Sequence, residues 1–366
     1  TLISAILRVT QAEWRTPVTR MAELITVAAI SVGALMPIID LGRPDRVVNM
    51  VLFGRFQSPL MWDIISITSY LAGSLIYLYL PLIPDFALMR DRLSERGVSV
   101  IKRKFYTFLA VGWQNTKQQQ QRLEKAIGIM AITIIPIAIS VHTVVSYVFS
   151  MTLRPGWNST VFGIYFVIGA IFSGIATILI VMAIFRKLYH LEEYITEKHF
   201  RNLSYLLLTS LFLYFYLTIG EYITIGYKME TEEKHLLESL LIGKNALGFW
   251  FFVVAGLVVP AFLLIIRRGS LIPRIITAAI LINVAMWVKR FIIVIPSIQV
   301  PLMPFEFGAY TPTWVEWSIT AAAFAAFALI FVVFAKVFPL ISIWEVAEQE
   351  ETKVFPQPRE GDRKTG

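Results

Sequence analysis

The chain has 366 residues, of which 57% are hydrophobic and only 16% are charged, and its formal net charge is +8. Because a soluble domain carries about 25% charged residues, this composition excludes an ordinary soluble fold. The basic residues lie mainly in the segments between apolar runs, where membrane proteins carry them, so the positive charge does not indicate nucleic-acid binding.

The apolar residues form eight runs, each longer than the roughly 20 residues that a helix needs to cross a bilayer. The runs lack the alternation of barrel strands, which leaves helices as the spanning structure. We therefore predict an all-α polytopic membrane protein, with a transmembrane domain over residues 1–345 and a polar cytoplasmic tail over 346–366. Residues 1–7 are expected to be the end of a preceding helix. The predicted spans are 20–41, 60–84, 126–151, 160–185, 203–227, 246–266, 275–297 and 315–345.

The loops between the spans alternate in their content of Lys and Arg. By the positive-inside rule the richer loops should be cytoplasmic, and the longest of them should form a surface helix or loop. With this orientation the C-terminal tail is cytoplasmic too. The basic loops are 85–124, 186–202 and 267–274, and the loops predicted to lie outside are 42–59, 152–159, 228–245 and 298–314.

The chain contains no cysteine and four histidines, of which only His142 lies in a predicted span. It therefore cannot hold an iron–sulfur cluster, a thioether-linked haem or a haem between two intramembrane histidines. We expect no metal site. If the chain handles electrons, they must pass through a diffusible organic carrier and through the clusters of a partner.

Ionisable residues within membrane spans are costly, and several of them share one level in the outer half of the predicted membrane. In chain order these are Asp40, Asp63, His142, Glu221, Lys289 and Arg290. Their common level indicates a site, and an imidazole beside carboxylates suits the proton chemistry of a quinone. Glu23 and Lys336 lie instead in the inner halves of their spans, where they either reach the surface or begin an inward proton route.

Our hypothesis places a quinone headgroup in the outer half of the membrane, between the second and third spans. His142 and Asp63 would form the proton-handling pair, and Asp40 would pass protons outward. Trp62 and Tyr70 would lie against the ring, although aromatic residues at such positions are as often ordinary packing.

Glu221 and Arg290 are placed second in this hypothesis, as supports of the site. Each charged residue also has a structural explanation. The two aspartates could cap helices at the membrane surface, the two cations could form a bridge with Glu221, and the histidine could hydrogen-bond between helices.

Motifs in order along nearly the whole chain resemble the NrfD/PsrC family of integral membrane proteins. Within that family the likeness is nearest to the ActC branch of alternative complex III. The matching stretches are Asp40–Pro44, Gly54–Asp63, Pro84–Asp91, Gly112–Trp113, Ser140–Val145, Pro155–Trp157, Phe172–Gly174, Met286–Phe291 and Tyr310–Glu316.

The resemblance implies a quinone-interacting membrane subunit without prosthetic groups, in the cytoplasmic membrane of a prokaryote. Such a subunit oxidises menaquinol or reduces menaquinone near the outer face, with proton translocation as a further expectation. It exchanges electrons with a ferredoxin-like iron–sulfur subunit docked outside, often beside a molybdopterin-type subunit and further membrane subunits. The implied fold is two four-helix bundles with flanking helices.

The chain departs from the ActC-like pattern at three site positions. Asp40 stands where that pattern often has His, Val148 where it has Asp, and Lys289 where it has Glu. Asp63 and His142 match it. The departures fit equally a related complex that reduces quinone, or one that serves sulfur compounds.

Two other classes of function compete with this interpretation. One is an ion-coupled secondary transporter, which tends to show broken helices and repeated halves. Pro136, Pro260 and Pro339 could break helices here, but the two halves of the chain do not look alike. The other is a structural membrane anchor for peripheral redox subunits. A co-purifying iron–sulfur protein would disfavour the transporter, and bound menaquinone would disfavour the anchor.

The topology is testable by cysteine labelling, because the native chain has no cysteine. A Gly308→Cys variant should react with an impermeant reagent added to intact cells, since residue 308 lies in a loop predicted to be outside. A Lys117→Cys variant should not react. The reverse pattern would overturn the orientation.

Overall fold

The structure is a computed structural model that describes residues 1–95, 100–266, 268–303 and 305–346. Within those ranges the chain is helical and contains no strand, which confirms the all-α prediction. The C-terminal tail predicted from residue 346 falls outside them, except for its first residue. The helices long and apolar enough to cross a membrane number eight in these ranges: Thr16–Ile39, Pro59–Leu93, Lys117–Ser150, Phe162–Leu188, Glu197–Lys228, Ala246–Ile265, Leu271–Gln299 and Trp314–Val337.

Side-chain caps define where several spans begin. In α7 (Lys117–Ser150), Thr116 and Gln119 form a capping box that satisfies free backbone N–H groups of the first turn. Thr313 and Glu316 do the same for α14 (Trp314–Val337). Pro136, which the sequence marks as a helix breaker, lies inside α7 without ending it.

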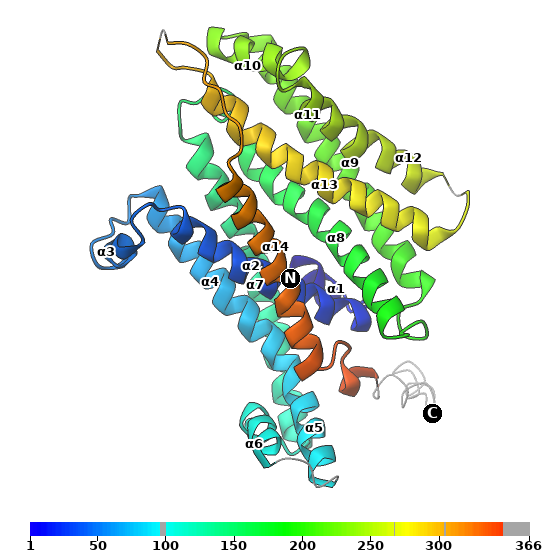
Figure 1. Cartoon of the computed structure of the whole chain (residues 1–366). Coiled ribbons are helices and arrows are strands. Elements are labelled where there is room, and N and C mark those ends of the chain that lie inside the picture. The colour runs from blue at the N-terminus through cyan, green and yellow to red at the C-terminus, as the bar shows by residue number, and fades with distance from the viewer. Residues whose placement is uncertain (96–99, 267, 304, 347–366) are drawn as a thin grey trace, which may run out of the picture.

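The spans form two groups that share one helix (Figure 1). In the first group, α1 (Leu2–Val9) packs on α2 (Thr16–Ile39) and α7, and α4 (Pro59–Tyr79) also packs on α2 and α7. In the second group, α9 (Glu197–Lys228), α13 (Leu271–Gln299) and the sixth span pack together. The shared helix is α8 (Phe162–Leu188), which contacts α2 and α7 on one side and α9 and α13 on the other.

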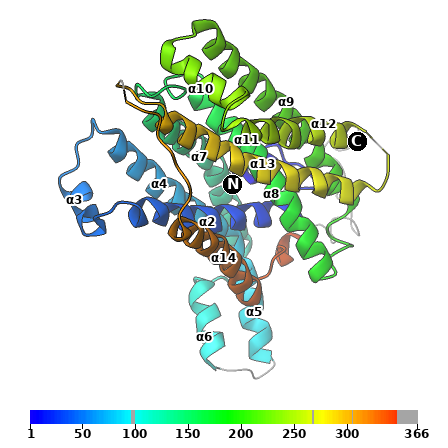
Figure 2. The same cartoon turned by 45° about the horizontal axis from the view of Figure 1, so that its top comes forward.

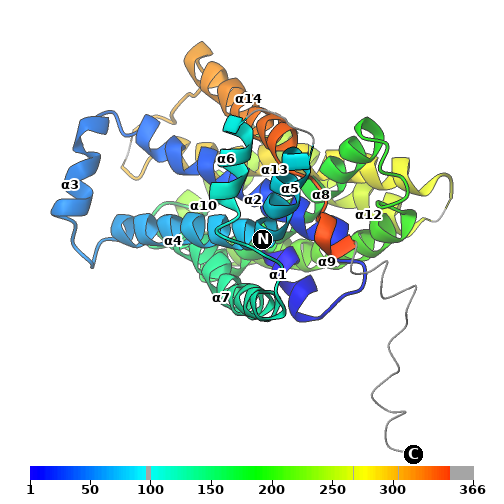
Figure 3. The same ribbon diagram turned by 90° about the horizontal axis from the view of Figure 1, so that it is seen from below.

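The eighth span lies at the edge of the molecule. Helix α14 packs on α2, and only 11% of its most apolar stretch is buried. Figure 3 shows α14 and the short helix α3 (Val47–Leu52) at the margins of the view. A span this exposed presents most of its surface to lipid or to another membrane subunit.

The two ends of the molecule are distinct. One end carries α3 and α10 (Thr231–Leu241), and we call it the α10 end. The other carries α5 (Ile83–Glu95) and α6 (Val100–Leu109), which pack side by side below α4 (Figure 2), and we call it the α6 end. The longest basic loop, which was predicted to form a surface helix or loop, therefore contains helices.

The sixth span is interrupted by a wider helical turn. Between α11 (Ala246–Phe251) and α12 (Val259–Ile265), residues Phe252–Val258 form a π-helix, labelled η3. This segment approaches α13 closely, because a Cβ added at Gly256 would lie 2.6 Å from the Cβ of Ala285. Such π segments are frequent at functional positions in helical proteins.

A buried ion pair ties the first group to the segment that follows α14. The Arg20 guanidinium in α2 pairs with the Asp85 carboxylate in α5, and both side chains are almost fully buried. Arg20 also donates to the carbonyl oxygen of Pro81 at 2.9 Å and to the hydroxyl of Ser342 at 3.3 Å. The backbone N–H of Trp344 donates to the other Asp85 oxygen at 3.2 Å. Three separate segments of chain thus meet at one ion pair.

Removing one partner of this pair should destabilise the protein. An Arg20→Met variant leaves the Asp85 charge buried without its counter-ion, which costs about 3–5 kcal/mol. We expect a clear loss of thermal stability in detergent. The double variant Arg20→Met/Asp85→Leu should recover much of that loss, and the exposed control Arg103→Met should melt like the native protein. A single variant as stable as the native chain would contradict the role assigned to the pair.

Candidate functional site

The candidate site is a cavity of about 340 Å³ inside the first group of helices. Its wall comes from α1, α2, α4, α7 and α8, and most of the lining side chains are aliphatic. His142 of α7 and Tyr70 of α4 supply aromatic polar groups, and Thr26 of α2 supplies a hydroxyl. A mostly apolar cavity of this size with a few convergent polar groups is the usual form of a site for a small organic molecule.

His142 and Tyr70 face each other across the contact between α4 and α7. Their ring centroids are 6.4 Å apart and the ring planes meet at 82°. The two helices approach closely about one turn from Tyr70 toward the α6 end, where a Cβ added at Gly73 would lie 2.8 Å from a side-chain carbon of Ile134. Within the described residues, neither ring nitrogen of His142 has a hydrogen-bond partner, so the imidazole is available to a ligand in the cavity.

The cavity lies deeper than the level expected from the sequence. Its lining from α2 runs from Ala22 to Ile30, which is the middle of that helix, and its lining from α8 runs from Val167 to Ile178. The site is therefore near the centre of the spans, toward the α10 end of α8. Of the residues predicted for the site, the cavity is lined by His142 and Tyr70.

Asp63 lies outside this cavity but on the same face of α4 as Tyr70. The two residues are two helical turns apart, which corresponds to about 10 Å toward the α10 end. Ser66 lies buried between them and donates to the carbonyl oxygen of Asp63 at 3.0 Å. One carboxylate oxygen of Asp63 is buried without a hydrogen-bond partner in the described chain. No hydrogen bond or ion pair joins Asp63 to His142 there. The two residues are therefore not a contacting pair, and Asp63 lies nearer the α10 end.

Asp40 and Trp62 are also placed away from the cavity. Asp40 follows the last turn of α2 and is exposed at the α10 end. The indole N–H of Trp62 donates to the carbonyl oxygen of Phe56 at 2.5 Å, which fixes the start of α4. Trp62 is thus an exposed side chain at the start of α4, and Asp40 has a surface position.

The predicted supports, Glu221 and Arg290, lie in the second group of helices together with Lys289. Glu221 accepts a hydrogen bond from Ser159 at 2.8 Å, and Lys289 donates to the hydroxyl of Tyr222 at 2.8 Å. Glu221 and Lys289 are buried and line a separate cavity of about 20 Å³. The bridge between them, which was the structural alternative to a functional site, is not among the ion pairs of the described residues.

Aromatic rings surround the two cations of α13. The Lys289 ammonium lies 4.8 Å from the ring centroid of Tyr222 and 5.1 Å from that of Phe252, the first residue of the π-helix. The Arg290 guanidinium carbon lies 4.4 Å from the ring centroid of Phe166. Cation–π contacts stabilise charges that have left water. Lys289 therefore has a structural setting in the second group, whereas Arg290 is close enough to His142 for their charges to interact.

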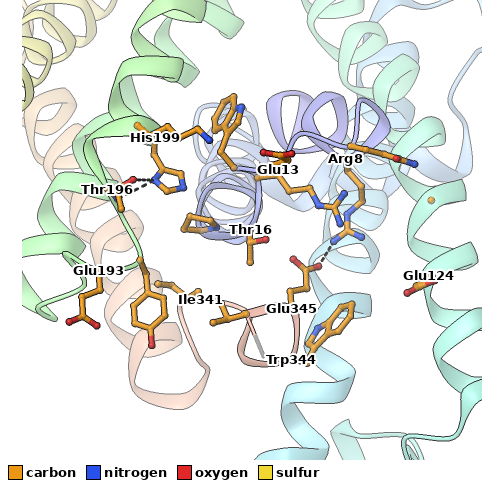
Figure 4. Close-up of a pocket in the computed structure, with 18 residues that line it drawn as sticks. Arg8, Glu13, Thr16, Glu124, Glu193, Thr196, His199, Ile341, Trp344 and Glu345 are labelled. Atoms are coloured by element: carbon orange, nitrogen blue, oxygen red, sulfur yellow. Dashed lines mark hydrogen bonds and ion pairs between the residues drawn. The ribbon is translucent and has the colours of Figure 1, made fainter. Parts of the chain in front are cut away.

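A larger cavity of about 1100 Å³ opens at the α6 end, and the sequence did not suggest it (Figure 4). It is lined by charged side chains from distant segments, among them Arg8, Glu124 and Glu345. Arg8 and Glu345 form an ion pair of 2.6 Å across it. No local pattern could have revealed this cavity, because its residues meet only through the folding of the first group onto the segment after α14.

Comparison with known proteins gives a consistent family. The model of the family described as "Polysulphide reductase, NrfD" matches residues 1–301. A selenate reductase subunit of Mesobacillus selenatarsenatis is 24% identical over 351 residues, which are 90% of this chain and 79% of that protein. A putative dimethyl sulfoxide reductase membrane subunit of Halobacterium salinarum is 27% identical over 163 residues, or 44% of this chain and 34% of that protein.

These two relatives are named as subunits of reductases, and neither name identifies the ActC branch. The family match extends over every helix that lines the His142 cavity. It covers most of the chain, and the chain therefore belongs to the NrfD polysulphide reductase family.

Proposed function

We propose that the chain is the quinone-reactive membrane subunit of a multi-subunit oxidoreductase, and that the His142 cavity holds the quinone headgroup. The observation that carries the proposal is the facing pair of His142 and Tyr70 in an otherwise mostly aliphatic cavity. The family is quinone-interacting, and the two relatives are named as subunits of reductases. The cavity volume of about 340 Å³ falls in the range of small-molecule sites.

The residues of the cavity suit a quinol that loses two protons and two electrons. The imidazole of His142 accepts a proton from a quinol hydroxyl or donates one to a quinone oxygen, because each ring nitrogen can hold or release a proton. The Tyr70 hydroxyl hydrogen-bonds the headgroup, and the aliphatic wall excludes water from it. Menaquinone is the substrate that we propose, following the resemblance to the family.

Protons would leave toward the α10 end along the face of α4. Ser66 and then Asp63 follow Tyr70 along this face, and the unpartnered carboxylate oxygen of Asp63 is available to accept a proton. In this arrangement His142 and Asp63 are not in contact, and the proton is relayed between them over two turns of α4. We assign the α10 end to the outside of a prokaryotic cytoplasmic membrane, on the Lys and Arg content of the loops.

The electrons must pass to another polypeptide, because the chain has no cysteine to hold a cluster. We propose that an iron–sulfur subunit docks on the α10 end over residues 42–59 and 298–314, with a molybdopterin-type subunit beyond it. Phe53 is 78% exposed and Phe305 is 74% exposed in these two segments. Exposed aromatic side chains outside the predicted spans are characteristic of protein interfaces.

A His142→Ala variant should lower quinol oxidation by the assembled complex by about 10²-fold, the low end of what a general base supplies. The measurement is steady-state turnover with a short-chain menaquinol, together with the quinone content of the purified complex. His190→Asn, a substitution in an exposed turn at the α6 end, serves as the matched control. Normal turnover and normal quinone content in an assembled His142→Ala complex would place the headgroup elsewhere.

An Asp63→Asn variant should slow turnover by about 10-fold or more while leaving quinone binding unchanged, because the amide cannot carry a proton but fills the same space. Asp91→Asn, an exposed carboxylate of α5 at the α6 end, is the control. Measuring the rate across pH distinguishes loss of the proton relay from loss of quinone binding, since loss of the relay should flatten the pH profile. A large loss of quinone binding in Asp63→Asn would show that this residue contacts the headgroup after all.

A further inference from the structure

A second carboxylate lies between the His142 cavity and the α6-end cavity. Glu23 of α2 is only 2% exposed, so it is enclosed by protein. The Ser4 hydroxyl of α1 donates to one of its oxygens at 2.6 Å, and the same hydroxyl is 3.4 Å from the hydroxyl of Tyr77. Ser4 and Tyr77 are fully buried as well. A continuous set of polar groups is costly in the middle of an apolar bundle unless it serves a purpose.

The two helices that carry these groups connect one cavity to the other. On α1, Arg8 lines the α6-end cavity, and Ser4 lies one helical turn further in. On α2, Thr16 lines the α6-end cavity, Glu23 lies two turns further in, and Thr26 lines the His142 cavity. One turn is about 5.4 Å, so Glu23 is within one turn of the headgroup cavity.

The two arginines near Glu23 are held by other carboxylates. Arg8 pairs with Glu345 at 2.6 Å, and Arg20 pairs with Asp85. No ion pair joins Glu23 to a cation in the part of the chain that the structure describes. A buried carboxyl group that is hydrogen-bonded by a hydroxyl, and not locked to a cation, can exist in either protonation state.

We propose that Glu23 is the proton-exchanging group that connects the headgroup cavity with the α6-end cavity. The inference rests on the proposed function, because it takes the His142 cavity as the place where the quinone reacts. Oxidation of a quinol releases two protons: one leaves along α4 as proposed above, and the other passes to the Glu23 carboxylate, within one turn of the headgroup cavity, and from there past Ser4 to the polar α6-end cavity. No electron moves on this route, and the same steps in reverse supply a proton to a quinone.

The first test follows protons on the α6 side. The complete complex is reconstituted in liposomes with a pH-sensitive dye on the side of the α6 end, and oxidation of a short-chain menaquinol is started. In the native complex each round of oxidation should change the pH on that side. A Glu23→Gln complex should lose this signal at least 10-fold while binding the short-chain menaquinone within about 2-fold of the native complex.

A matched control is Glu233→Gln, which removes a buried carboxylate of α10 at the opposite end of the molecule. Its proton signal on the α6 side should equal that of the native complex. A Ser4→Ala variant keeps the carboxylate and removes its hydrogen-bond donor, so it should slow the signal by about 3-fold to 10-fold. If Glu23→Gln fails to assemble, an unchanged signal in Ser4→Ala overturns the proposal by itself.

The second test does not depend on turnover. Infrared difference spectra of the reconstituted complex should show a protonatable carboxyl band that is absent from Glu23→Gln and that responds to a pH change on the α6 side. Retention of the α6-side proton signal in Glu23→Gln, or a carboxyl band that responds only from the α10 side, would overturn the route. Failure of the native complex to bind menaquinone would instead overturn the proposed function, so the two failures are distinguishable.

Discussion

A charged side chain that enters a bilayer must find its counter-charge within the protein, because lipid offers neither water nor ions. Arg20 and Asp85 meet this constraint for the first group of helices. Their pairing draws α2, the start of α5 and the segment after α14 to one point, since Arg20 also donates to Pro81 and Ser342. The α6-end cavity is lined by residues on either side of this point, including Thr16 and Trp344. Its shape therefore depends on the ion pair being intact.

The sequence predicted the number of spans but not which spans are neighbours, for a physical reason. Hydropathy and the Lys and Arg content of loops report where a residue lies along the membrane normal, and the number of spans was confirmed within the described ranges. They carry no information on which helices are neighbours. Glu221 and Asp63 have similar predicted depths, yet Glu221 lies in the second group of helices and Asp63 in the first. A common level was therefore not evidence of a common site.

Two predicted site residues, His142 and Tyr70, do meet in one cavity. His142 was predicted because it is a lone imidazole in an apolar span, and Tyr70 because its aromatic ring lies on a helix expected to be the neighbour of that span. Both features are present in the structure. Arg20 and Asp85 were missed because each lies near the end of its span, where a charge can equally reach the surface. Only the folded chain shows that both are enclosed.

The π-helix in the sixth span has a consequence for how this gene can vary. A π-helical segment holds one residue more than an α-helix would over the same axial length. Loss of a single codon between Phe252 and Val258 would let the backbone relax into an α-helix, and the side chains on both sides of the segment would keep nearly the same orientation, because the wide turn already absorbs the extra residue. Phe249 before the segment and Pro260 after it would stay in their packing. The same loss from a regular α-helix would turn every later side chain by about 100° around the axis.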